Sequence, residues 1–493
     1  MRIDGRFQAV NELLHAYVSL IAVLVWAGWV GAGVPGGQGG SAGLPGAARV
    51  VFLDNCSGVE NGSATYDPET RTCGGGEYRA FSELGEAAAA LEQADVLYIR
   101  GGTYSRLVMP NVKVHGNEVN YWEGALAIDV TGTAERHKGV RAYRGEQVII
   151  QAKAGVSEYN PDPSDESFKR SSHFYPNPAI SIGGAYVDVS GLKTFGQVVI
   201  SGHDVVVERC DLGGGGPHMN QGQVVVINSN RAGGVYNVVV RNNRIHHSTW
   251  GESAGNGATL MCYNASFLVE HNEFHDGYGS DICIKDTGMQ EGRTIEIRYN
   301  LFGPSSLGSG GRCGVEGHNQ DVKIDRILIH HNVFLNKKTG VSFRQPARMG
   351  TIVYNNTFVN CGGDVCDWQN PEIHALNNLY YHCGGGQSFY DIQTEPWAKL
   401  ESDWNLFHCT AGETGWRHKY RSRAGTLRGW QEYSGKDAHS VWKDPGFVNP
   451  GGKRVEDFKR KGPANIRDVE TGEYGPVCGA YVTGEEIIGI EPR

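Results

Sequence analysis

Charged residues are few in this chain, and long basic stretches are absent. Charged side chains make up 20% of the 493 residues, and the formal net charge at pH 7 is −9. A nucleic-acid-binding surface needs clustered Lys and Arg residues, so this composition argues against a nucleic-acid partner. The 11 cysteines include no CxxC pair, which argues against a structural zinc site.

Glycine, in contrast, is abundant. The 70 glycines suit a turn-rich β architecture better than a helical bundle. The length allows one large domain or two to three ordinary ones, and repeat proteins freely exceed the usual size of a single domain. A long β-rich repeat protein is compatible with both the glycine count and the chain length.

The N-terminus carries one uncharged, mostly apolar run at residues 16–30. Arg2 and Arg6 precede the run, and small residues with prolines follow it at 31–46. This order is typical of a secretory signal, so we expect a secreted, periplasmic or cell-surface protein. The run is at the lower limit for spanning a bilayer, so an uncleaved anchor stays open as the only expected membrane contact.

A repeated segment is the strongest signal in the sequence. Strings such as VVVRNNRI, IEIRYNLF and ILIHHNVF share an asparagine at intervals of 29, 28, 32, 24 and 22 residues, and an earlier copy has Cys210 at that position. The six asparagines are Asn243, Asn272, Asn300, Asn332, Asn356 and Asn378.

Apolar residues alternate around each of these asparagines. In one copy Val238, Val240 and Ile245 follow this pattern, which predicts a strand with one buried face. Asparagine tolerates a left-handed backbone and bonds to its neighbours, so we expect it in a tight corner between strands. Stacked corners let the side-chain amides bond along a ladder.

The segments on either side of the repeat extend this prediction. Residues 80–93 (AFSELGEAAAALEQ) read as a short amphipathic helix that caps the first coil, and DVLYIRGGTY follows it. The strings SDWNLFHC and GWQEYSGKDAHSVWKDPGFVNP follow the repeat. Four tryptophans after residue 400 are expected to be buried in a closing segment: Trp404, Trp416, Trp430 and Trp442.

With these features, residues 50–485 resemble the bacterial right-handed parallel β-helix proteins, which include polysaccharide lyases, glycosidases and uronan epimerases. The resemblance implies an all-β, right-handed parallel β-helix with an N-terminal capping helix and an irregular C-terminal closing segment. The expected organisation is 1–34 signal or anchor, 35–49 Gly/Pro linker, 50–400 β-helix and 401–493 closing segment packed on the helix.

A second strand in each coil supplies the candidate site. If Ile282 and Ile284 point inward, as Val341 and Phe343 do, alternate residues face outward. Aligning the coils on this rule gives one outward ladder, spaced by roughly 5 Å per coil, and a neighbouring acidic one. The first ladder holds Tyr263, Lys285, His318, Arg344 and Trp368, and the second holds Asp281 and Glu316, with Asp286 just beyond the strand.

This set suits β-elimination on an acidic, uronate-containing polysaccharide. The proton beside a carboxylate becomes acidic only when that carboxylate's charge is neutralised, and then a base removes it. We expect Lys285 as the base, Arg344 as the group that binds the carboxylate, and His318 as a second acid or base.

The remaining ladder residues have expected roles in binding. Calcium has oxygen ligands available in Asp281, Asp286 and Glu316. Tyr263 and Trp368 are expected to stack on sugar rings, and Gln345 to contact the substrate. In lyases of the resembled fold, a lysine and an arginine on neighbouring coils move the proton, often with calcium. Lys285 and Arg344 match them in type but lie two coils apart.

Two other classes stay open. A β-helix glycoside hydrolase is an alternative, in which Asp281 pairs with Asp286, Glu316 or Asp364, although the preceding loop reads GNGATL and lacks an acidic residue. A non-catalytic carbohydrate-binding or surface protein is the other. An epimerase is disfavoured because no DPHD string occurs, and a monomer is expected.

Histidines and cysteines give two minor expectations. The histidine pairs beside the corner asparagines, such as His330 and His331, look like a metal cluster only in the linear sequence and are expected as corner residues. Cys56 and Cys73 flank a Gly/Asn/Thr-rich loop that a disulfide could close.

Overall fold

The computed structural model describes most of the chain after residue 48. The described residues are 49–108, 112–114, 117–119, 123–153, 178–215, 223–228, 234–248, 258–285, 292–305, 313–317, 324–343, 350–367, 372–382, 388–392, 399–410, 412–413, 425–462, 467–469 and 474–492. The predicted signal or anchor therefore lies outside this part. Within it, no helix is long and apolar enough to cross a membrane.

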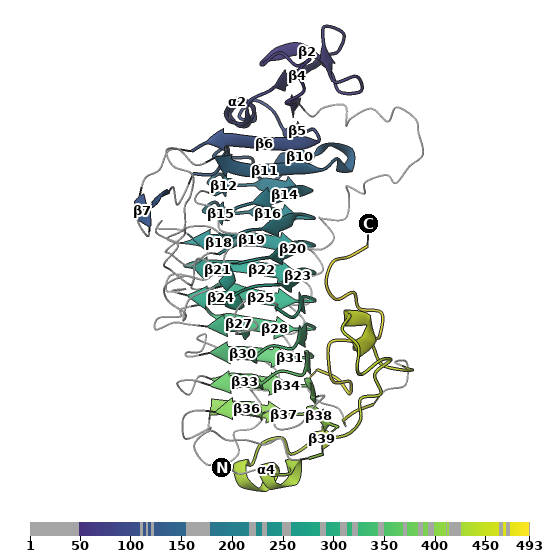
Figure 1. The fold of residues 1–493 in the computed structure, drawn as a ribbon. Coiled ribbons are helices and arrows are strands. Elements are labelled where there is room, and N and C mark those ends of the chain that lie inside the picture. Colours follow the sequence, from purple (N-terminus) through teal and green to yellow (C-terminus); the bar gives the residue numbers. More distant parts are fainter. Residues whose placement is uncertain are drawn as a thin grey trace. The chain divides into compact units, whose positions relative to one another are not determined.

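Three long sheets run side by side through the unit formed by residues 49–492 (Figure 1). Sheet 1 has 15 strands. Its order is β3 (Thr72–Cys73), β2 (Ser63–Asp67), β4 (Tyr78–Phe81), β1 (Val50–Leu53), β5 (Val96–Ile99), β10 (Lys138–Ala142), β13 (Val187–Ser190), β16 (Val205–Glu208), β19 (Val235–Arg241), β22 (Ala265–Glu270), β25 (Thr294–Arg298), β28 (Arg326–His330), β31 (Thr351–Tyr354), β34 (Ile373–Leu376) and β37 (Leu400–Asp403). At its start β2 pairs antiparallel with β3 and β4, and the other neighbours pair in parallel.

Sheets 2 and 3 complete each coil. Sheet 2 contains β6 (Gly102–Leu107), β11 (Val148–Lys153), β14 (Leu192–Phe195), β17 (Asp211–Gly213), β20 (Arg244–His246), β23 (Glu273–His275), β26 (Leu301–Phe302), β29 (Val333–Leu335), β32 (Thr357–Val359), β35 (Leu379–His382), β38 (Leu406–Cys409) and β39 (Val441–Trp442). Sheet 3 contains β9 (Leu126–Ile128), β12 (Ile180–Ile182), β15 (Val198–Ile200), β18 (Val225–Asn228), β21 (Ala258–Tyr263), β24 (Ser280–Lys285), β27 (Cys313–Gly317), β30 (Thr339–Phe343), β33 (Gly363–Asp367) and β36 (Ser388–Ile392).

The remaining elements are small. They are the antiparallel pair β7 (Val112–Val114) and β8 (Asn117–Val119), the helices α2 (Leu84–Ala90) and α4 (Leu427–Ser434), and the 3-10 turns η1 (Tyr143–Gly145) and η4 (Val455–Phe458). Because each coil contributes one strand to each sheet in turn, the predicted right-handed parallel β-helix is confirmed.

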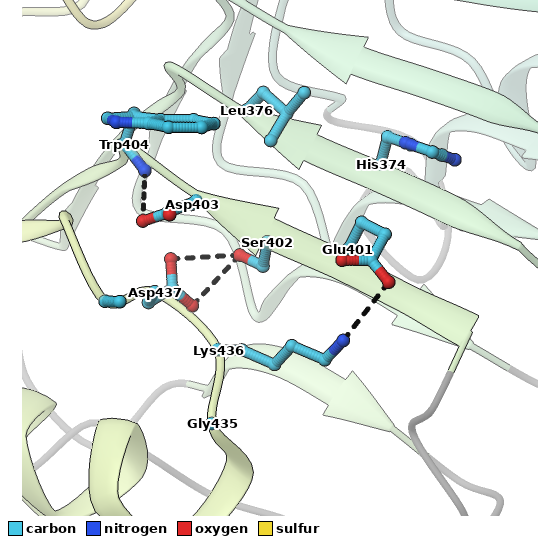
Figure 2. Close-up of a pocket in the computed structure, with 10 residues that line it drawn as sticks. His374, Leu376, Glu401, Ser402, Asp403, Trp404, Gly435, Lys436 and Asp437 are labelled. Carbon is cyan, nitrogen blue, oxygen red and sulfur yellow. Dashed lines mark hydrogen bonds and ion pairs between the residues drawn. The ribbon is translucent and has the colours of Figure 1, made fainter. Parts of the chain in front are cut away.

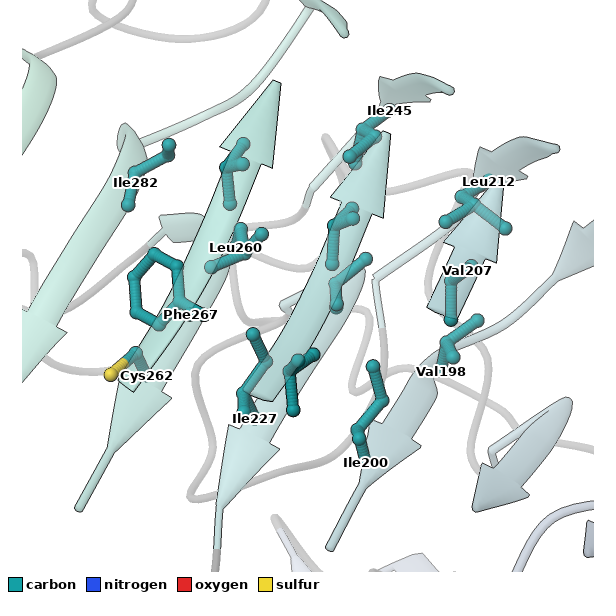
Figure 3. Packing of buried hydrophobic residues seen from close by; sticks show 14 of the residues in the cluster. Val198, Ile200, Val207, Leu212, Ile227, Ile245, Leu260, Cys262, Phe267 and Ile282 are labelled. Carbon is teal, nitrogen blue, oxygen red and sulfur yellow. The ribbon is translucent and has the colours of Figure 1, made fainter. Parts of the chain in front are cut away.

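The register of sheet 1 is the one that the sequence repeat predicts. Val240 pairs with Val269, which pairs with Ile297, and each lies three residues before its corner asparagine. The inward residues of all three sheets meet in one core (Figure 3). On sheet 2, aromatic rings stack along that core with centroids 4.6–5.2 Å apart: Phe274, Phe302, Phe334, Phe358, Tyr380 and Phe407.

The corner asparagines form a continuous, fully buried ladder. Each backbone N–H donates to the side-chain Oδ1 of the next asparagine, as Asn272 does to Asn300 at 3.0 Å. Each Nδ2 also donates to a sheet 1 carbonyl of the preceding coil, as Asn300 does to Val269 at 2.9 Å. Asn405 extends the ladder by one more coil beyond the six predicted members.

One detail of the predicted corner is wrong. The left-handed backbone is adopted by the residue before each ladder asparagine, for example His271 and Tyr299, both at φ 55°. The ladder asparagines themselves are absent from the described residues with positive φ. Their amides are used for bonding along the ladder, and the preceding residue makes the turn.

Both ends of the coil stack are covered. At the N-terminal end, Leu84, Ala87 and Ala88 of α2 pack into the core, so the expected capping helix is present but shorter than 80–93. At the other end, the ladder finishes on the segment after α4. The Asn405 N–H donates to Ser440 Oγ at 2.8 Å, and Asn405 Nδ2 donates to the buried Asp437 carboxylate at 3.0 Å.

Residues 474–492, here named the C-terminal strap, run back along the coils (Figure 1). Side-chain amides of Asn377 and Asn355 donate to strap carbonyls at 2.8 and 3.0 Å. The Gly489 N–H donates to the carbonyl of Tyr299 at 2.8 Å, and Glu491 exchanges two hydrogen bonds with Asn242. Apolar strap residues also cover the outer face of sheet 2.

Of the four C-terminal tryptophans, Trp430 is buried and Trp404 and Trp442 are half-buried, while Trp416 lies outside the described residues. The thiols of Cys56 and Cys73 are both free, so the expected option of a disulfide between them is not realised here.

Candidate functional site

The outer face of sheet 3 carries the candidate site. Ile282, Ile284, Val341 and Phe343 all lie in the core, so the inward–outward alternation assumed from the sequence is confirmed. Tyr263 pairs with Lys285 on the adjacent strand, as the predicted outward ladder requires.

Most of that ladder continues outside the described residues. Ile284, Gly317, Phe343 and Asp367 pair with one another in successive coils. His318, Arg344 and Trp368 each follow one of these paired residues directly in the sequence, as Lys285 follows Ile284. The roles expected for these three residues, and for Gln345 and Asp286, therefore stay predictions.

Lys285 ends strand β24 and is half-buried. It is the only basic residue in the ten strands of sheet 3. Its ammonium Nζ lies 5.8 Å from the centroid of the Tyr263 ring, within the range of a cation–π contact. Strand β24 thus presents one basic side chain at the point where it leaves the sheet.

Below Lys285 the outer face is apolar and buried. Val226, Ala258, Met261, Tyr263 and Cys283 form a cluster separate from the core inside the coils. Tyr263 is 5% exposed, and burial raises the pKa of the Cys283 thiol well above its usual value. The expectation that Tyr263 stacks on a sugar ring is corrected, because its ring is packed in this cluster and contacts Lys285.

Asp281 lies in a buried ion pair. Its Oδ2 is 2.5 Å from the Lys337 Nζ, and both side chains are 0% exposed. Burial raises the pKa of Asp281 to about 6, against the opposing pull of Lys337. The expectation that Asp281 faces an open groove as a calcium ligand is therefore wrong.

Lys337 was missed by the sequence reasoning. It precedes β30, two coils after Asp281, and the alternation of inward and outward residues applies only inside the strands. Gly314, in the coil between them, has no room for a side chain, because a Cβ there would lie 2.4 Å from the Phe334 ring.

Glu316 is also buried, at 3% exposure, and accepts a hydrogen bond from Ser280 Oγ at 2.5 Å. In the register Glu316 pairs with Cys283. The expectation that it shares a ladder with Asp281 is therefore wrong. Two of the three expected calcium ligands are thus engaged within the protein and do not fit an accessible calcium site. Among the described residues, no group of three His, Cys, Asp or Glu side chains is arranged to hold a metal ion.

The corner histidines contact carboxylates. His330 Nε2 lies 3.1 Å from Glu296, and His246 Nε2 lies 2.7 Å from Asp211. Burial lowers the pKa of His330 despite the nearby carboxylate. These contacts are those of corner residues tied to the neighbouring coils.

No family model matches the chain. No curated protein matches it in sequence. Among solved structures, pectate lyase Pel9A is 13% identical, with a TM-score of 0.48, over 88% of this chain and 96% of that one. An alginate lyase from Paenibacillus sp. str. FPU-7 is 12% identical (TM-score 0.37, 66% and 92% covered), and the polysaccharide lyase Pedsa3628 of family PL6 from Pseudopedobacter saltans is 10% identical (0.37, 83% and 98%).

At these identities and TM-scores the likeness concerns the β-helix alone. Substrate and reaction have to come from the side chains of this chain.

Proposed function

We propose that this protein is a polysaccharide lyase that cleaves a uronate-containing polymer by β-elimination on the outer face of sheet 3. The observation that carries the proposal is Lys285, a half-buried lysine at the exit of β24 and the only basic residue among the strands of that sheet. A base at this position can reach a sugar that lies across the ends of the strands.

The reaction needs few groups. Lys285 removes the proton on the ring carbon beside the uronate carboxylate, the bond between the next ring carbon and the leaving oxygen breaks, and a carbon–carbon double bond forms between these two ring carbons. The leaving oxygen takes up a proton, for which His318 is the proposed donor. Arg344 is proposed to pair with the uronate carboxylate and so to stabilise the charge that develops in the transition state.

The two buried carboxylates have a different role in this proposal. Asp281 pairs with Lys337 and Glu316 with Ser280, and these contacts stabilise the protein beneath the site. The two carboxylates take no part in the chemistry. Neutralisation of the uronate carboxylate then falls to Arg344, and no step depends on calcium.

The test is an absorbance assay on a panel of uronate polymers (alginate, pectate and glycosaminoglycans), with and without calcium. Elimination produces a conjugated double bond that absorbs in the ultraviolet. We expect the absorbance to rise for one polymer. Lys285→Ala and Arg344→Ala should lower the rate at least 100-fold.

Lys338→Ala is the matched control, because Lys338 is an exposed lysine in the turn before β30. Elimination that persists in Lys285→Ala would refute the proposed base. New reducing ends without ultraviolet absorbance would instead favour the glycoside hydrolase, although Asp281 and Glu316 are not free to act as its carboxylate pair. Binding of a polymer without any cleavage would favour the non-catalytic alternative.

A further inference from the structure

A pocket lies on sheet 1, at the C-terminal end of the coil stack (Figure 2). Its floor is the outer face of β34 and β37, where His374 pairs with Glu401 and Leu376 pairs with Asp403. The segment Gly435–Ala438, which follows α4, forms the opposite wall, and Trp404 closes the corner. Its volume is about 310 Å³, at the lower end of the range for small-molecule sites.

The two carboxylates of the floor are held in place. The Asp403 carboxylate accepts hydrogen bonds from the backbone N–H groups of Trp404 and His439 at 2.8 and 2.7 Å, and contacts His439 Nδ1 at 2.7 Å. Glu401 Oε1 accepts from Lys436 Nζ at 3.3 Å. Since Glu401 and Asp403 are two residues apart on one strand, their backbones lie about 7 Å apart.

The charges of the pocket select for an uncharged ligand. Each floor carboxylate is paired with a basic side chain, Glu401 with Lys436 and Asp403 with His439, and the carboxylate of Asp437 is buried just behind them. An anionic sugar would face these three carboxylates across one lysine. An ammonium group would compete with Lys436 for Glu401.

Hydrogen-bond capacity remains on both floor carboxylates. A carboxylate accepts about four hydrogen bonds. Within the described residues, Asp403 accepts three and Glu401 accepts one. The groups that can still bind here are hydroxyl donors. The largely buried Leu376 and the Trp404 indole, which stacks on His439 with ring centroids 5.4 Å apart, line the pocket beside them (Figure 2).

We propose that this pocket binds one neutral hexopyranose unit, through hydroxyl hydrogen bonds to Glu401 and Asp403 and apolar contact with Trp404 and Leu376. It lies on a different sheet from the proposed elimination site. The pocket anchors the protein to an uncharged glycan or to the uncharged sugar of a mixed polymer. This inference does not rest on the proposed lyase activity.

The test uses the full chain with the methyl glycosides of glucose, mannose and galactose, followed by saturation-transfer NMR and calorimetry. We expect millimolar binding of at least one of them and at least tenfold weaker binding of methyl galacturonide and glucosamine. Two variants locate the site. Ala438→Trp fills the pocket from an exposed position and should abolish binding, and Glu401→Gln should weaken it about tenfold.

Glu432→Gln is the matched control, because Glu432 is an exposed carboxylate of α4 that pairs with Arg428 and does not line the pocket, so the substitution should leave binding unchanged. Three results would overturn the inference: no neutral glycoside binds, the uronide or the amino sugar binds best, or Ala438→Trp binds as the unmodified chain does. Elimination measured in Ala438→Trp should be unchanged, which separates failure of this pocket from failure of the lyase proposal.

Discussion

The buried pair of Asp281 and Lys337 predicts a stability defect that depends on pH. The pKa of Asp281 is raised from 3.8 to about 6. This group therefore contributes stability below pH 4 that is lost as the pH rises through 6. The shift is about 2 pKa units. At about 1.4 kcal/mol per unit, it corresponds to a loss of about 3 kcal/mol of unfolding free energy.

Lys337→Met removes the ammonium and keeps the length of the side chain. Above pH 7 the variant leaves a buried, unpaired carboxylate, which should cost about 3–5 kcal/mol of unfolding free energy. At pH 5, Asp281 carries a proton in both proteins, so the cost should stay within about 1 kcal/mol. Urea unfolding at pH 5 and pH 8, followed by tryptophan fluorescence, measures the difference.

Lys338→Met, one residue further and exposed, is the control and should change stability little at either pH. Equal destabilisation of Lys337→Met at pH 5 and pH 8 would refute the reasoning. It would mean that the lysine matters for packing and that Asp281 is not ionised in the folded protein.

Three further predictions concern the fold. Asn300→Ala should lower the unfolding free energy by about 2–4 kcal/mol in the same urea assay, because it leaves buried partners in two coils without hydrogen bonds. Gly314→Ala should cost about 2–3 kcal/mol and lower the melting temperature, since the new Cβ collides with the Phe334 ring. Asp437→Asn should cost about 2–3 kcal/mol, because four side-chain donors lose a charged acceptor, and limited proteolysis should then cut the C-terminal segment faster while the coils stay intact.

The coil architecture was predictable because it depends on local patterns in the sequence. Alternation of period two sets the inward face, and a fixed offset from each asparagine sets the register, so Val240, Val269 and Ile297 align as the repeat predicts. The amide ladder followed from the same spacing. The backbone conformation at the corner did not, because the left-handed residue varies in type from His271 to Asn355 and leaves no repeated letter.

The candidate site was less predictable because burial on an outer face is not a local property. Alternation correctly separates Ile282 and Ile284 from Asp281, Cys283 and Lys285, but it does not show whether an outward side chain is open to solvent. Asp281 meets a lysine 56 positions later in the chain, and Cys283 is covered within an apolar cluster. Only Lys285 keeps, within the described residues, the half-exposed placement that its expected role needs.

The C-terminal strap changes how a protein of this kind can come apart. In a plain solenoid each coil touches only its neighbours, so terminal coils can fray one after another. Here the bond between Asn242 and Glu491 joins positions 249 residues apart, and the strap bridges every coil between Asn242 and Asn377. When the last coil unfolds, these bonds still hold the C-terminal strap to the middle of the stack, which opposes fraying from this end. Closing so long a loop costs little more entropy than closing a shorter one, since the cost grows only with the logarithm of its length. The strap residues are thus bonded to coils that precede them by up to 249 residues.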